Sequence, residues 1–143
     1  MVWKIAIACL LVAATVGVHA VGLARLLTLL SKAHAIPPAR LWPITWLLIR
    51  MAWALILIHA VEITVWGLFY FEVGCLPTFS SAVYFSGVTY ATVGYGDLLL
   101  PNSWRMLAPL EGLTGILMCG LSAGLFFAVV NRLFGKRFGA KTL

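Results

Sequence analysis

The sequence TVGYGD at residues 92–97 decides how the rest of this chain is interpreted. It follows residues 79–91, an apolar segment whose aromatic and small side chains suit a helix. At ~1.5 Å per residue this helix would be ~20 Å long, which is too short to cross ~30 Å of hydrocarbon. Glycine-rich backbone at membrane depth is tolerated only where it is buried in protein or lines a water-filled path. The two segments together predict a re-entrant loop that lines a pore.

The composition of the whole chain indicates that its solvent is lipid. Hydrophobic residues make up 63% of the 143 residues and charged residues only 10%, whereas soluble domains carry about half apolar and about a quarter charged residues. Three apolar stretches, 5–30, 44–71 and 106–130, each exceed the roughly 20 residues that a spanning helix needs. We therefore predict an all-α membrane protein with three transmembrane helices, a re-entrant pore helix and a filter loop.

The predicted parts of the chain follow from these stretches and from the signals between them. Thr78 or Ser80 is the expected N-cap of the short helix. Residues 1–31 also suggest a secretory signal peptide, but their apolar run reaches Leu30 and exceeds the ~7–15 residues of such a segment. We expect an N-terminal transmembrane helix at 1–31, a cytoplasmic connection at 32–43, a pore domain at 44–133 and a basic cytoplasmic tail at 134–143. Within the pore domain we expect an outer helix at 44–71, a pore helix at 78–91, a filter at 92–97 and an inner helix at 103–133.

The charges are distributed as in a membrane protein. The formal net charge is +6, and most basic residues lie in 25–50 and 132–141, whereas three of the four acids lie in 72–111. The positive-inside rule then places the first connection and the C-terminus in the cytoplasm and the N-terminus outside. We expect a multi-pass protein of the cell membrane whose basic tail contacts lipid headgroups, with no nucleic acid as partner.

The residue types in 92–97 suit the passage of a cation. A cation that leaves water needs oxygen ligands, and neutral backbone carbonyls hold it loosely enough for it to leave again. Successive carbonyls point the same way only if the backbone torsions alternate in hand, which Gly94 and Gly96 allow. The hydroxyl of Thr92 can add a further oxygen. The preceding helix would direct its negative C-terminal end toward the cation.

Residues 88–97, VTYATVGYGD, resemble the pore signature of potassium channels, and the similarity extends over residues 44–133. Because each chain carries one such loop, four chains are needed to close a ring of carbonyls, which predicts a homotetramer. K⁺ is then the transported ion, and no organic cofactor is expected. The resemblance implies that the K⁺ sites are formed by the carbonyls of Thr92, Val93, Gly94 and Tyr95, with Gly96 near the mouth.

The pore helix departs from the pattern of better-known family members at two positions. Val88 stands where some members have a glutamate that braces the filter aspartate. Tyr84 falls where a tryptophan bonds that aspartate, which is Asp97 in this chain. We predict a hydrogen bond between Tyr84 and Asp97 as a brace of the filter; the alternative is that Tyr84 only packs.

Two residues of the inner helix are further candidates. Glu111 lies about two turns into the predicted helix, where a charge is costly unless it is buried in protein. It is predicted to bond Ser80, Ser81 or Thr89 and so support the filter; alternatively it faces an external water pocket. Gly115 falls near the hinge position of potassium-channel gates, although a small residue there also suits close helix packing.

His59 and Glu62 are three residues apart on the outer helix and therefore share a face. We expect them toward the external side, with Arg105 at a similar depth as a candidate partner of Glu62. Because histidine titrates near neutrality, the pair is a candidate sensor of external pH. The alternative is a static hydrogen-bonded pair within the membrane.

The function that these features predict is passive, selective conduction of K⁺. One alternative is a channel that conducts K⁺ and Na⁺ alike, and another is a non-conducting subunit of a larger transport complex. An enzyme is not expected, because the sequence offers no nucleophile–base pair or metal cluster. Cys75, in the second connection, leaves open a disulfide to a neighbouring subunit.

Overall fold

The computed structural model describes residues 2–32 and 41–138, which are helical apart from the turns and loops between 73 and 106. Three of the helices in this part are long and apolar enough to cross a membrane, and the other is short. The chain is thus a helical multi-pass membrane protein, as the composition predicted. The elements in order are α1 (Val2–Lys32), α2 (Leu41–Glu72), α3 (Phe79–Tyr90) and α4 (Leu107–Phe138).

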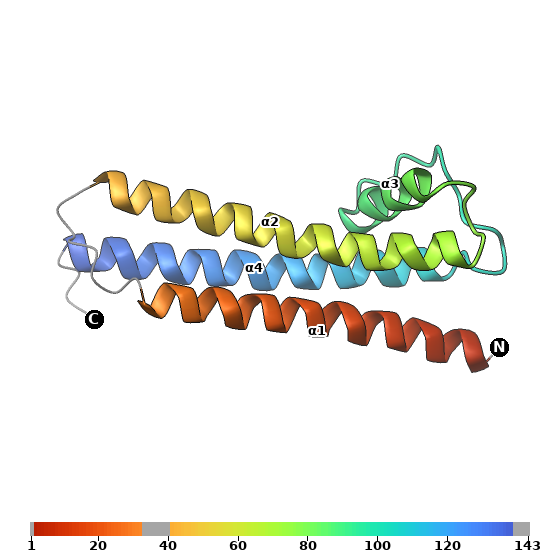
Figure 1. Ribbon diagram of the computed structural model, residues 1–143, viewed down its shortest axis with the longest axis horizontal. Coiled ribbons are helices and arrows are strands. Elements are labelled where there is room, and N and C mark those ends of the chain that lie inside the picture. Colours follow the sequence, from red (N-terminus) through yellow and green to blue (C-terminus); the bar gives the residue numbers. More distant parts are fainter. Residues whose placement is uncertain (1, 33–40, 139–143) are drawn as a thin grey trace.

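The three long helices run side by side, and α3 lies at one end of the molecule (Figure 1). It packs beside the C-terminal half of α2 and the N-terminal half of α4, at the end where α1 begins. The start of α1 therefore lies at the opposite end of the molecule from the end of α4, as an odd number of crossings requires. That the N-terminus faces the outside remains a prediction.

Helix bounds differ from the predicted ones mainly in the inner helix, which begins at Leu107 rather than at residue 103. Residues 102–106 form turns instead, in which the amide of Trp104 donates to the carbonyl of Pro101. Pro43 and Pro109 each stand third in their helices, where a missing amide costs no intrahelical bond. The helix also continues to Phe138, through the first part of the predicted tail. The predicted first connection lies mostly in residues 33–40, outside the described residues.

The apolar core sits at the α3 end of the molecule. It contains Trp66 and Tyr70 of α2, which are fully buried, together with Phe85 of α3 and Trp104 of the last loop. A second, smaller cluster of buried apolar side chains joins Leu26 of α1 to Met51 and Leu55 of α2. Most other apolar side chains of the long helices face outward, since no more than 22% of each apolar window is buried within the structure. Such a surface is stable only against lipid or against other apolar protein.

Candidate ion pathway at residues 92–97

The start of α3 is fixed by a capping box. Thr78 is the N-cap, and its hydroxyl accepts from the amide of Ser81 at 3.1 Å, while Ser81 Oγ accepts from the amide of Thr78 at 3.2 Å. Of the two N-caps predicted, Thr78 is therefore the one used. Close packing on α2 depends on Gly67, where an added Cβ would lie 2.9 Å from the Cα of Val83. The loop thus begins at the end of a firmly seated helix.

The backbone of the loop after α3 alternates in hand. Thr92, Gly94 and Gly96 have φ values of +60°, +56° and +76°, and no other residue of 92–97 has a positive φ. A left-handed conformation carries little penalty for glycine but is unfavourable for threonine. The conformation at Thr92 is held by its amide, which donates to the carbonyl of Thr89 at 2.9 Å. The alternation expected from the two glycines therefore starts one step earlier, at Thr92.

The amides and the carbonyls of this loop have different environments. The amides of Val93 and Gly94 both donate to the carbonyl of Val88, at 2.9 and 3.3 Å. In contrast, the carbonyls of residues 92–96 accept no hydrogen bond from the part of the chain that the structure describes. The side chains of Val93 and Tyr95 are also exposed, at 53% and 71%. The loop therefore offers a row of free carbonyl oxygens at the surface of a single chain.

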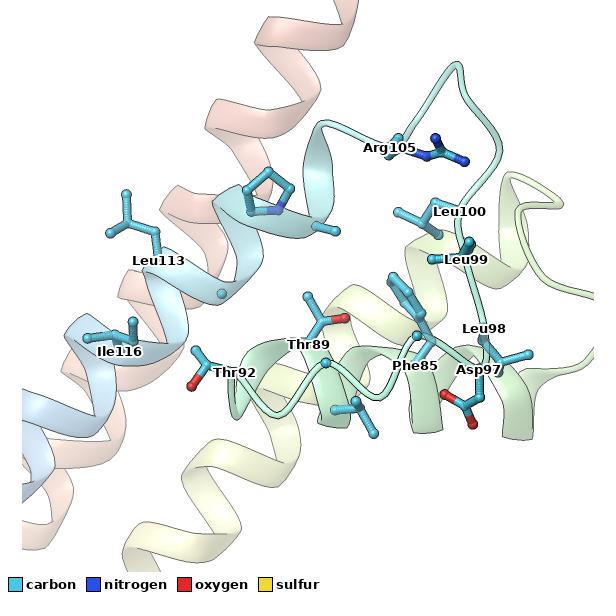
Figure 2. Close-up of a pocket in the computed structure, with 16 residues that line it drawn as sticks. Phe85, Thr89, Thr92, Asp97, Leu98, Leu99, Leu100, Arg105, Leu113 and Ile116 are labelled. Carbon is cyan, nitrogen blue, oxygen red and sulfur yellow. The ribbon is translucent and has the colours of Figure 1, made fainter.

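Beside the loop lies an open groove of about 540 Å³. Figure 2 shows the loop running back along α3 from Thr92 to Asp97, with the first turns of α4 on its other side. Most of the lining is apolar, and it is open to the surface rather than enclosed by this chain. The lining includes Phe85, Val88 and Thr89 of α3, Leu98–Leu100 after the filter stretch, Arg105, and Pro109, Leu113 and Ile116 of α4.

The outer end of the loop is tied to α3 by the hydrogen bond predicted from the sequence. Tyr84 Oη donates to Asp97 Oδ2 at 2.9 Å. This bond to a carboxylate raises the pKa of Tyr84, because ionisation of the phenol would lose the donor and bring two negative charges together. Val88 contributes through its backbone, as described above, and its side chain lines the groove.

Glu111 of α4 forms hydrogen bonds that hold α3 in place, but not with the partners that were predicted. The side chain is fully buried, so it does not face a water pocket. Tyr70 Oη donates to Glu111 Oε2 at 2.7 Å, and Ser86 Oγ lies 2.5 Å from Glu111 Oε1. The predicted partners Ser80, Ser81 and Thr89 are wrong because Glu111 faces the middle of α3, on the side turned to α2. Ser86 also lies 2.8 Å from the carbonyl of Ile63, so this contact links three helices.

A second buried carboxylate, Glu62, lies at the end of α3 next to the loop. Its Oε1 lies 2.8 Å from Nδ1 of His19, its Oε2 lies 3.0 Å from Nδ1 of His59, and Tyr90 Oη donates to it. The prediction that His59 and Glu62 share one face of the helix was correct. The suggested partner Arg105 was wrong, because it lies in the loop before α4 and lines the groove. His19 was missed in the sequence, since it lies in another helix, 43 residues away.

The grouping of His19, His59 and Glu62 is also one that could hold a transition metal, with ligand atoms within 4.8 Å of one another. Ligands about 2.0–2.1 Å from a tetrahedral Zn²⁺ stand about 3.3 Å apart. The observed nitrogen–oxygen distances of 2.8 and 3.0 Å are those of N–H···O hydrogen bonds. We therefore assign protons to these positions.

Gly115 allows α4 to pack closely against the end of α3. A Cβ at this position would overlap the backbone carbonyl oxygen of Tyr90, so only glycine lets α4 approach the end of α3 this closely. The hinge role remains a prediction. Gly115 thus joins Glu62 in fixing the residue from which the loop departs.

Three membrane helices, a short helix and a loop of free carbonyls define a class of membrane protein built to carry ions. A sequence model described as ion channel matches residues 56–132, which is more than half of the chain. The chain therefore belongs to this ion channel family. The matched range runs from the middle of α2 into α4 and leaves out α1. No curated protein and no solved structure matches the chain.

Proposed function

We propose that this chain is one subunit of a potassium-selective channel, in which four chains surround a filter formed by residues 92–96. The observation that carries the proposal is the row of carbonyls at 92–96 that accept no hydrogen bond from residues 2–32 or 41–138, on a backbone of alternating hand. Unpaired backbone carbonyls are rare at membrane depth unless a ligand or a partner satisfies them. K⁺ is a ligand that stacked carbonyl rings bind and release.

The proposed ion sites use the carbonyls of Thr92, Val93, Gly94 and Tyr95, with Gly96 at the mouth. The amides of Thr92, Val93 and Gly94 donate to carbonyls of α3, those of Thr89 and Val88. The carbonyls are therefore free to face a common axis. The C-terminal end of α3, which carries the negative end of the helix dipole, lies next to Thr92 and would attract a cation there.

The homotetramer follows from one loop per chain, since a ring of carbonyls needs several copies. The exposed side chains of Val93 and Tyr95 and the open apolar groove beside them support a neighbouring copy at this face. In the proposed assembly the channel lies in the cell membrane with the N-terminus outside. Conduction is passive, and we expect no catalysed reaction.

The test is a flux assay with the purified protein in proteoliposomes under opposed K⁺ and Na⁺ gradients. We expect K⁺ flux that Ba²⁺ blocks and that exceeds Na⁺ flux many-fold. Equal fluxes would replace the proposal by a channel unselective between the two ions. Absence of any Ba²⁺-sensitive flux would leave a non-conducting subunit as the better description.

A matched pair of glycine variants ties the flux to the filter backbone. An added Cβ at Gly94 meets no atom of the described residues within 4 Å, so the harm of Gly94→Ala comes from its φ of +56° and not from a clash. We expect this variant to abolish selective flux. Gly17→Ala in α1 also meets nothing within 4 Å, but it lies in a helix and should conduct like the wild type.

A further inference from the structure

Five polar side chains join all four helices at the level where α3 ends. We define the Glu62 cluster as His19 of α1, His59 and Glu62 of α2, Tyr90 of α3 and Ser122 of α4. Glu62 is fully buried, His19 and Tyr90 nearly so, and the side chain of His59 is 17% exposed. An ionised carboxylate in such surroundings is very costly unless its charge is balanced. How the protons are arranged in the cluster therefore matters for its stability.

The hydrogen bonds fix the positions of the protons when Glu62 is ionised and both imidazoles are neutral. A carboxylate only accepts, so Nδ1 of His19, Nδ1 of His59 and the hydroxyl of Tyr90 all donate to Glu62. Nε2 of His59 then carries no proton and accepts from Ser122 Oγ at 3.0 Å. In this state every bond is made, but the cluster carries one uncompensated negative charge.

The two imidazoles differ in their capacity to take one more proton. Nε2 of His19 is buried, and no group in the described part of the chain bonds it, so a proton there would become an unpaired buried donor. Nε2 of His59 faces Ser122, whose hydroxyl can turn from donor to acceptor. A proton on His59 therefore keeps every hydrogen bond and brings the charge of the cluster from −1 to 0.

Other titratable groups face the cluster from α4. Cys119 lies within electrostatic range of Glu62 and Tyr90, and Glu111 lies within range of Tyr90. An ordinary thiol stays protonated between pH 5 and 8, whereas an ordinary imidazole changes charge there. Of the two imidazoles bonded to Glu62, His59 is the one whose second nitrogen has a partner in the described residues, Ser122 Oγ, that can accept an added proton.

Tyr90 connects the cluster to the candidate ion pathway. It is the last residue of α3, two positions before Thr92, and its side chain is held by Glu62 and His59. Its backbone carbonyl packs against Gly115 of α4. A change in the bonds of Glu62 therefore acts on the residue that sets where the loop begins.

We infer that the Glu62 cluster is a proton-binding site, with His59 as the acceptor, that positions Tyr90 and through it the first residue of the filter. The effect on K⁺ flux rests on the proposed function, whereas the proton site itself does not. With the proton bound, imidazolium and carboxylate neutralise each other and hold Tyr90. Without it, the uncompensated buried charge loosens the cluster, so that flux falls as pH rises.

The first experiment measures K⁺ flux in proteoliposomes with equal pH on both sides, from pH 5 to pH 8. We expect a several-fold fall in the wild type and a flat profile for His59→Gln. Ser122→Ala removes the acceptor of the Nε2 proton and should move the midpoint toward lower pH by about one pH unit. The control is Thr64→Val, since the Thr64 hydroxyl is exposed on α2 and bonds only the carbonyl of Ala60 in its own helix; it should keep the wild-type profile. A flat wild-type profile, or an unchanged profile for His59→Gln, would overturn the inference.

The second experiment does not depend on conduction. Nitrogen NMR of ¹⁵N-histidine-labelled protein follows each imidazole, with signals assigned by their loss in His19→Gln and His59→Gln. We expect His59 to gain a proton between pH 8 and pH 5 while His19 keeps its proton on Nδ1. A His59 signal that does not change overturns the proton site. A changing His59 signal in protein without K⁺ flux supports the site and refutes the proposed function instead.

The same samples distinguish a proton from a metal ion. If the cluster binds Zn²⁺ at one ion per chain, and His19→Gln abolishes that binding, the site is a metal site and the inference is wrong. If added Zn²⁺ leaves both imidazole signals unchanged, the assignment of protons is supported. The distances of 2.8 and 3.0 Å predict the second result.

Discussion

The two buried glutamates hold the same short helix by different chemistry. Glu111 reaches the middle of α3 and is bonded by two hydroxyl groups, those of Tyr70 and Ser86. Glu62 reaches the end of α3 and is bonded by one hydroxyl and two imidazoles. Both carboxylates are fully buried within this chain. Their partners, and not their burial, set them apart.

The difference separates a fixed support from a responsive one. Hydroxyl groups of serine and tyrosine keep their protons throughout the neutral range, whereas imidazoles exchange theirs within it. The hydroxyl partners of Glu111 therefore keep their protons between pH 5 and 8. A change in the protonation of a partner is expected only at the end of α3 next to the loop. If both regions responded alike, the comparison would fail.

The largest effects are expected from replacing each carboxylate by an apolar side chain. Glu62→Leu leaves the buried donors of His19 and Tyr90 without an acceptor, because His59 Nδ1 can still donate to Tyr90 Oη. Glu111→Leu leaves only the hydroxyl of Tyr70, because Ser86 Oγ can still donate to the carbonyl of Ile63. Because each buried donor left unpaired costs about 1–3 kcal/mol, Glu62→Leu should destabilise the protein by about 2 kcal/mol more than Glu111→Leu. Thermal unfolding in detergent, compared at a fixed pH of 6, measures the order. The reverse order would mean that the middle of α3 is the more important anchor.

A smaller effect is expected from filling the contact between α4 and Tyr90. Gly115→Ala forces the carbonyl of Tyr90 away, at a cost of about 1–3 kcal/mol for an overpacked contact. It should alter the pH dependence of flux, because it displaces the residue that the Glu62 cluster positions. Gly120→Ala on the same helix meets nothing within 4 Å and serves as the control. The same pH dependence of flux in both variants would mean that Tyr90 does not link the Glu62 cluster to the filter.

Another variant tests whether the pH dependence of flux depends on the Glu62 cluster or on the packing of α1 in general. Trp66 Nε1 donates to Thr15 Oγ1 at 2.9 Å, a second buried bond between α2 and α1. Trp66→Phe removes this bond and should cost about 1 kcal/mol for the hydrogen bond alone. The pH profile of K⁺ flux should stay that of the wild type, since His19 is untouched. A profile changed as much as in His59→Gln would assign the response to general packing of α1.

The helices could be predicted from the sequence because length and apolar composition alone require them in lipid. The N-cap at Thr78, one of two predicted, and the backbone freedom of Gly94 and Gly96 were also predictable, since each depends on residues close in the chain. The start of α4 was placed four residues early. Serine is a preferred N-cap residue, so Ser103 suggested that the helix starts there. In the structure Trp104 is buried and residues 102–106 form turns, so the helix starts later.

The partners of the two glutamates could not be predicted for a different reason. A span that is apolar on all sides carries no periodic pattern, so nothing in the sequence says which face of α1 meets α2. His19 therefore gave no sign of its contact with Glu62, and Ser86 gave none of its contact with Glu111. The Tyr84–Asp97 bond was predictable because the family's pattern supplied both the positions and the chemistry.

The smallest effect is expected at Tyr84, whose bond to Asp97 is exposed to solvent. Water replaces a lost bond at such a site, so Tyr84→Phe should leave stability almost unchanged. The bond raises the pKa of Tyr84 above the ordinary value of about 10, so it is fully present below pH 10 and is lost as pH rises through the raised value. Its contribution should therefore be constant from pH 5 to 8, unlike that of Glu62. Recordings at pH 6 and pH 8 should show faster decline of K⁺ current in the variant, by the same factor at both. A factor that differed between pH 6 and pH 8 would mean that the outer end of the loop also responds to the Glu62 cluster. The pH response would then not be confined to the end of α3.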